Sequence, residues 1–99
     1  MTIGQLQQII RATFGERDQR RGVEGTFMWF MEEVGELSAA LRKGDRAEAG
    51  PEFADVLAWL ASMANNAGID LEAEITAKYG TACPRCASIP CQCSFADKP

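Results

Sequence analysis

Residues 26–41 of this 99-residue chain read TFMWFMEEVGELSAAL and carry its clearest helical pattern. Large apolar side chains recur there at the spacing of one face of an amphipathic helix. Thr26 stands where an N-cap is expected, and Gly44 stands where the helix would stop. The segment therefore predicts a helix with one buried stripe. Its members are Phe30, Val34, Leu37 and Leu41.

A first helix is predicted upstream, from about Ile3 to about Phe14, behind a capping box formed by Thr2 and Gln5. Residues 15–25 are rich in charge and glycine, so they are expected to form a charged connection to the next helix. Its basic cluster is the only one in the chain, and it either contacts phosphates or is a solvated loop. The cluster comprises Arg17, Arg20 and Arg21.

A third helix is expected to begin at Pro51, because proline suits a first helical position, and to end at Gly68. Upstream, Asp45 would cap at most a short turn. A fourth helix is expected between Asp70 and Gly80. The inward side chains of the third helix are predicted to be Phe53, Val56, Leu57, Leu60, Met63 and Ala64.

The fold class is predicted to be all-α, because no segment alternates polar and apolar residues as a strand does. We expect a four-helix-type bundle at residues 1–80 and a cysteine-rich tail at residues 81–99. A chain of 99 residues buries a modest fraction of its surface. We therefore expect the bundle to be completed by oligomerisation.

The charge balance restricts the classes of partner. Ten Lys and Arg against fourteen Asp and Glu give a net charge of −4, which argues against broad binding to a nucleic-acid backbone. Apolar stretches are short and the N-terminus lacks a signal-peptide pattern, so a cytoplasmic protein without a membrane partner is expected. The chain has no histidine, so catalysis would rest on carboxylates, a metal or cysteine.

Two pairs of carboxylates stand at helical i,i+3 spacing, Glu33 with Glu36 and Glu52 with Asp55. Residues three apart lie about 60° apart around a helix, so each pair can point toward one centre between two packed helices. Each pair also borders an apolar stripe, where an unpaired charge costs several kcal/mol. The alternative is a solvated acidic face, but the setting favours a site for Mg²⁺ or Mn²⁺.

The pattern Glu-Glu-x-x-Glu, fifteen further residues, and Glu-x-x-Asp resembles the signature of MazG-like nucleoside triphosphate pyrophosphohydrolases, which belong to the all-α NTP pyrophosphatase group. The flanking segments at 24–29 and 53–57 are similar too, and the resemblance covers roughly residues 3 to 80. It implies Mg²⁺-dependent hydrolysis of a (deoxy)nucleoside triphosphate to the monophosphate and pyrophosphate. The natural role would be to remove non-standard or surplus nucleotides, as a homodimer or homotetramer.

The resemblance also implies roles for single residues. Glu33, Glu36, Glu52 and Asp55 match the metal ligands, and Glu32 matches the first Glu of the motif. Glu32 either touches a second ion, orients the attacking water or simply faces solvent.

Four more residues are candidate substrate contacts. Lys78 resembles a basic position near the triphosphate, although a cation also suits the last turn of a helix. Tyr79 is a candidate contact for a base or sugar. Trp29 and Trp59 either stack on a nucleotide or pack in the core or between subunits.

All four cysteines fall within eleven residues, as Cys-x-x-Cys, four residues, then Cys-x-Cys. Four thiolates at this spacing suit a structural Zn²⁺ better than disulfides do in a cytosolic protein. Free thiols or a disordered tail are the alternatives. The candidate ligands are Cys83, Cys86, Cys91 and Cys93.

A rival function belongs to another class. The acidic pairs could hold a structural cation in a non-catalytic interaction module whose zinc tail docks a partner. A third interpretation, a zinc knuckle that binds single-stranded nucleic acid, has few basic or aromatic residues to support it near the cysteines, chiefly Arg85 and Phe95.

Overall fold

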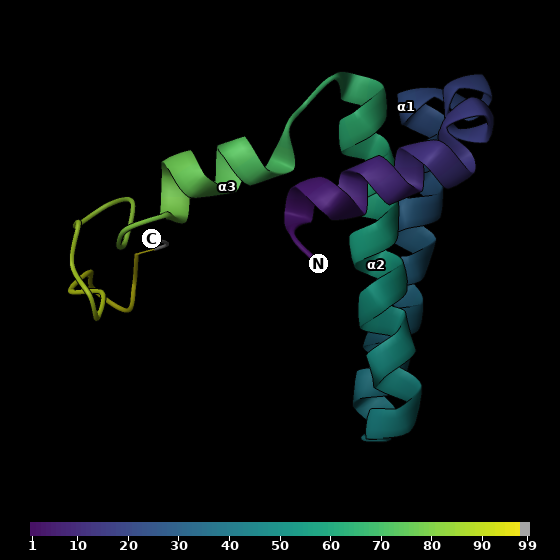
Figure 1. The fold of residues 1–99 in the computed structure, drawn as a ribbon. Helices are drawn as coiled ribbons and strands as arrows, with labels where there is room; N and C mark the ends of the chain where they lie inside the picture. The colour runs from purple at the N-terminus through teal and green to yellow at the C-terminus, as the bar shows by residue number, and fades with distance from the viewer. Residues whose placement is uncertain (98–99) are drawn as a thin grey trace.

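The computed structural model describes residues 1–97, which form three helices and no strand. The helices are α1 (Ile3–Lys43), α2 (Arg46–Ala67) and α3 (Leu71–Tyr79), and the cysteine tail follows them (Figure 1). The prediction of an all-α class is confirmed. The helices number three rather than four, because the first two predicted helices share α1.

A tight turn makes α1 and α2 antiparallel, and the second half of α1 lies along α2 (Figure 1). Gly44 ends α1 in the left-handed conformation, with φ 73° and ψ 18°, which glycine adopts at little cost. Asp45 caps α2 by accepting hydrogen bonds from the backbone N–H groups of Ala47 and Glu48.

Gly22 interrupts α1 with φ 79° and ψ 171°, a region essentially restricted to glycine. Residues 3–21, the N-terminal arm, consequently turn across the second half of α2 (Figure 1). Side-chain amides join the two elements: Gln7 Nε2 donates to Asn65 Oδ1 at 3.0 Å, and Asn66 Nδ2 donates to the carbonyl oxygen of Asp18 at 3.0 Å.

The prediction that residues 15–25 form a connection was wrong, since all but Gly22 are helical. The charges pair along the helix, with Arg20 bonded to Glu16 at 3.0 Å and Arg21 bonded to Asp18 at 2.8 Å. Thr26 is not an N-cap either. It is fully buried inside α1, and its hydroxyl donates to the carbonyl oxygen of Gly22 at 2.8 Å.

The prediction that a helix starts at Pro51 was also wrong, because α2 begins at Arg46 and continues through the proline. A proline normally disfavours helical geometry in the residue before it through contact with that residue's Cβ. That residue is Gly50, which has no Cβ. The short turn expected at Asp45 is therefore the first part of a long helix.

Helix α3 is held to the start of α1 by a few polar contacts. The backbone N–H of Leu71 donates to Gln7 Oε1 at 2.8 Å, and the backbone N–H of Gly4 donates to Glu72 Oε1 at 3.3 Å. From there α3 extends away from the α1–α2 hairpin toward the cysteine tail (Figure 1).

The core of the single chain is small. The buried apolar residues of the described chain are one isoleucine and four alanines. Several side chains predicted to face inward are about half exposed, among them Leu41, Phe53 and Leu57. None of the helices in residues 1–97 has an apolar stretch long enough to cross a bilayer.

Candidate active site

Three carboxylates meet where α1 and α2 run side by side. Glu33 and Glu36 come from successive turns of α1, and Glu52 comes from α2. One oxygen from each lies within 4.8 Å of the others. Two helices thus bring three hard oxygen donors close together, and the role of these residues as metal ligands stays a prediction.

The carboxylates of Glu33 and Glu52 are only partly satisfied. In each, Oε2 is buried without a hydrogen-bond partner. Within residues 1–97, no ion pair involves any of the three acids. A buried carboxylate oxygen without a partner is costly, and a divalent cation is the partner that this donor set suits. The residues present therefore fit Mg²⁺ or Mn²⁺.

The pKa values of two of these carboxyl groups are raised by their closely packed surroundings. Burial raises the pKa of Glu33 and that of Glu52, and the negative charges of Glu36 and Asp55 raise both further. Asp55 therefore lies close enough to act on the cluster, although its own oxygens are not among those within 4.8 Å. Glu32 is exposed on α1 and belongs to no such group.

A cavity of about 370 Å³ opens beside the acids, between the N-terminal arm and α2. Arg17 and Arg21 line it from the arm, while Asp55 and Trp59 line it from α2. The cavity thus places two cations and an aromatic ring next to one of the predicted metal ligands. Part of the basic cluster therefore faces a cavity.

The aromatic wall of the cavity is built by stacking. Trp59 lies 6.2 Å from Trp29 between ring centroids, at an interplanar angle of 19°. The guanidinium carbon of Arg21 lies 4.8 Å from the Trp59 ring centroid. Trp29 is half exposed, so the pair combines helix packing with an accessible face.

Asp18 orients this arginine and was not predicted as a site residue. Its side chain is 3% exposed, bonds to Arg21 at 2.8 Å and borders the cavity. Its Oδ2 is buried and has no hydrogen-bond partner. The only sequence signal was its i,i+3 spacing from Arg21, which is common on solvated helices.

Lys78 and Tyr79 lie at the exposed end of α3, with the Lys78 ammonium 5.6 Å from the Tyr79 ring centroid. Because α3 extends away from the hairpin, this chain does not bring the pair beside its own acidic cluster (Figure 1). Their predicted contact with substrate stays a prediction.

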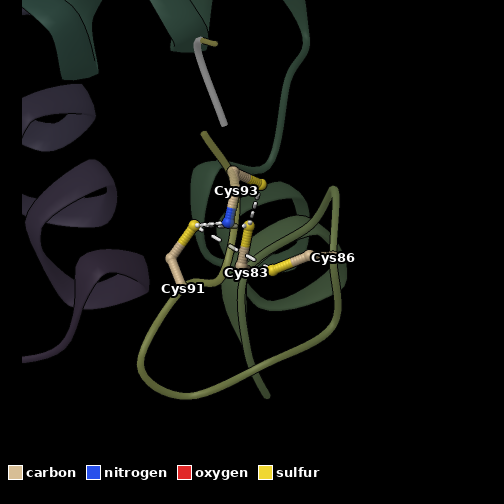
Figure 2. Close-up of side chains that lie close together, drawn as sticks. All are labelled: Cys83, Cys86, Cys91 and Cys93. Carbon is tan, nitrogen blue, oxygen red and sulfur yellow. Dashed lines mark hydrogen bonds between the residues drawn. The ribbon is translucent and has the colours of Figure 1, made fainter. Parts of the chain in front are cut away.

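The four cysteines form a second cluster, and their sulfur atoms turn toward a common centre (Figure 2). All are free thiols. Backbone N–H groups, chiefly that of Gln92, lower the pKa of Cys86 to about 6, and backbone N–H groups also lower the pKa of Cys83. The neighbouring Cys91 raises the pKa of Cys93 to about 12, so the metal-free cluster shares its protons unequally.

Comparison with known families gives a match that covers both acidic pairs. The sequence profile of the MazG nucleotide pyrophosphohydrolase domain matches residues 21–87, which is more than half of the chain. The matched segment contains the five predicted catalytic residues, four glutamates and Asp55, and it also includes Cys83 and Cys86. No curated protein matches the chain significantly.

Proposed function

Because the chain belongs to the MazG nucleotide pyrophosphohydrolase family, we propose that it hydrolyses (deoxy)nucleoside triphosphates between the α and β phosphates. One water is consumed, and the products are the nucleoside monophosphate and pyrophosphate. This reaction would clear unwanted nucleotides from the cellular pool. The observation that carries the proposal is the group of three carboxylates with two buried oxygens that lack partners.

Glu33, Glu36 and Glu52, with Asp55 beside them, would hold Mg²⁺ or Mn²⁺. The ion would neutralise phosphate charge as the bond breaks, which is the main requirement of phosphoryl-transfer chemistry. Glu32 would orient the attacking water from the exposed side of α1. Since the chain has no histidine, carboxylates are the proton acceptors available at this site.

The cavity beside Asp55 would bind the nucleotide. Arg17 and Arg21 offer charge-assisted hydrogen bonds to phosphate oxygens, and the Trp59 ring offers a surface for base stacking. A volume of about 370 Å³ falls within the range of small-molecule sites. Lys78 and Tyr79 would contact substrate only across subunits, because their own helix leads away from this cavity.

A second copy of the chain would complete the bundle. Large apolar side chains on both long helices are about half exposed, and exposed apolar surface of this extent marks an interface. They include Phe27, Met31, Phe53 and Leu57. A homodimer or homotetramer would cover these side chains, and light scattering would test it: a particle mass of 10.8 kDa would contradict the assembly.

The direct test is pyrophosphate release from a panel of ribo- and deoxyribonucleoside triphosphates with Mg²⁺ or Mn²⁺. Glu36→Gln should lower turnover at least about 100-fold, because a direct metal ligand matters more than its supporting shell. Glu74→Gln, on the exposed face of α3, is the matched control and should retain activity. A folded chain that releases no pyrophosphate from any nucleotide would support the interaction module instead.

A further inference from the structure

The cysteine cluster stands apart from the acidic site, and nothing in the proposed hydrolysis uses it. We propose that Cys83, Cys86, Cys91 and Cys93 bind one structural Zn²⁺ as thiolates. The ion would organise the segment that follows α3. Binding releases thiol protons and involves no oxidation or reduction.

The spacing of the sulfur atoms carries the proposal. Zinc binds thiolates at about 2.3 Å, so the four sulfurs of a tetrahedral site lie about 3.8 Å apart. The Sγ atoms of Cys83 and Cys93 are 3.8 Å apart, those of Cys86 and Cys91 are 3.9 Å apart, and those of Cys83 and Cys91 are 3.6 Å apart. A disulfide would need about 2.05 Å. These three separations match those of a tetrahedral zinc site, and all four sulfurs lie within 4.8 Å of one another.

The backbone supports these sulfurs as an outer shell. The N–H of Gln92 donates to Cys86 Sγ at 3.3 Å, and the N–H of Cys93 donates to Cys91 Sγ at 3.3 Å. Behind Cys86, Ala87 takes a left-handed φ of 58° and donates its N–H to the carbonyl oxygen of Cys83 at 2.8 Å. Such N–H groups stabilise thiolates and orient metal ligands.

The tail also needs a cross-link to be ordered. Its two largest apolar side chains, Ile89 and Phe95, are exposed, so residues 81–97 have little core of their own. A metal commonly supplies the folding energy of such small segments. Four protein ligands leave no open coordination position, and soft thiolates favour zinc over magnesium. The ion would therefore be structural and independent of the carboxylates.

Metal analysis of the full chain, purified under reducing conditions, tests this assignment. Wild type should carry one zinc per chain, and after metal removal Co²⁺ should give the absorption of a tetrahedral thiolate site. Replacing Cys91 and Cys93 together by Ser should weaken zinc binding more than about 100-fold, since loss of outer-shell partners alone costs up to about that factor. Gln92→Ala is the matched control, because it lies between them and keeps the backbone N–H.

Glu36→Gln should retain its zinc in full, so failure of the catalytic proposal would leave this one unaffected. Four reactive thiols that bind neither Zn²⁺ nor Co²⁺ in wild-type protein would overturn the assignment. Iron in place of zinc, or a disulfide under reducing conditions, would overturn it as well. These readouts use the wild-type chain, so they hold even where the double variant does not fold.

Discussion

Replacing Gly22 by alanine should destabilise the chain by an amount that its backbone geometry fixes. At φ 79° and ψ 171° Gly22 occupies a region that side chains avoid, and holding another residue there costs about 1–3 kcal/mol. No atom lies within 4 Å of a Cβ built at this position, so no steric contact adds to the backbone cost. The expected loss is therefore about 2 kcal/mol.

Two other glycines calibrate the measurement. Gly35 lies inside α1 with open space around it, so Gly35→Ala should raise the free energy of unfolding by up to about 1 kcal/mol. Gly44 has the ordinary left-handed conformation, with φ 73° and ψ 18°, and Gly44→Ala should cost about 1 kcal/mol. From most to least stable, the order should be Gly35→Ala, wild type, Gly44→Ala and Gly22→Ala.

Chemical denaturation followed by circular dichroism would measure these differences at one fixed protein concentration, since an oligomer's stability depends on concentration. In thermal melts, 1 kcal/mol corresponds to about 4–8 °C for a domain of this size. A Gly22→Ala variant as stable as wild type, with the arm still in place, would refute the reasoning. It would mean that α1 passes through this point in an ordinary conformation.

The remaining predictions concern the charges. Burial and neighbouring charges raise the pKa values of Glu33 and Glu52. The metal-free protein should therefore lose stability as the pH rises from 4.5, the ordinary pKa of a glutamate, through the raised pKa values of these two residues. Thermal melts in EDTA should show this loss, and Mg²⁺ should reverse it. Glu36→Gln should stabilise the EDTA-treated protein and reduce the gain from Mg²⁺ in the same melts; a larger gain would contradict its place as a ligand. Arg21→Ala should lower the free energy of unfolding by about 2–3 kcal/mol, because the carboxylate of Asp18, which is 3% exposed, loses its partner. Arg20→Ala removes an exposed ion pair and should change the free energy of unfolding by less than about 0.5 kcal/mol. Equal losses for the two variants in chemical denaturation would contradict this.

Local pattern was enough to predict the helical class and the meeting of Glu33, Glu36 and Glu52, because helical periodicity fixes which side chains share a face. It misplaced the helix ends at residues 15–25 and at Pro51. In both places the outcome depends on one glycine: Gly22 alone breaks α1, and Gly50 lets α2 continue through a proline.

The role of Asp18 was beyond local pattern for a different reason. Its significance depends on burial, and burial comes from the arm lying across α2, where Asn66 bonds its backbone. The half-exposed apolar stripes have the same origin, since a single sequence shows which side chains are apolar but not what covers them. Tertiary contacts decide both.

The break at Gly22 places the two walls of the proposed nucleotide cavity on separate segments of the chain, the N-terminal arm and α2. The family match begins at residue 21, so nearly all of the arm lies outside the matched segment, although it supplies Arg17 and part of the cavity lining. Substitutions in the arm can therefore alter the proposed phosphate contacts of Arg17 and Arg21 while the carboxylates on the hairpin keep their positions. Under the proposed function, phosphate binding by the arm and metal binding by the hairpin would lie on parts of the chain that evolution can alter one at a time.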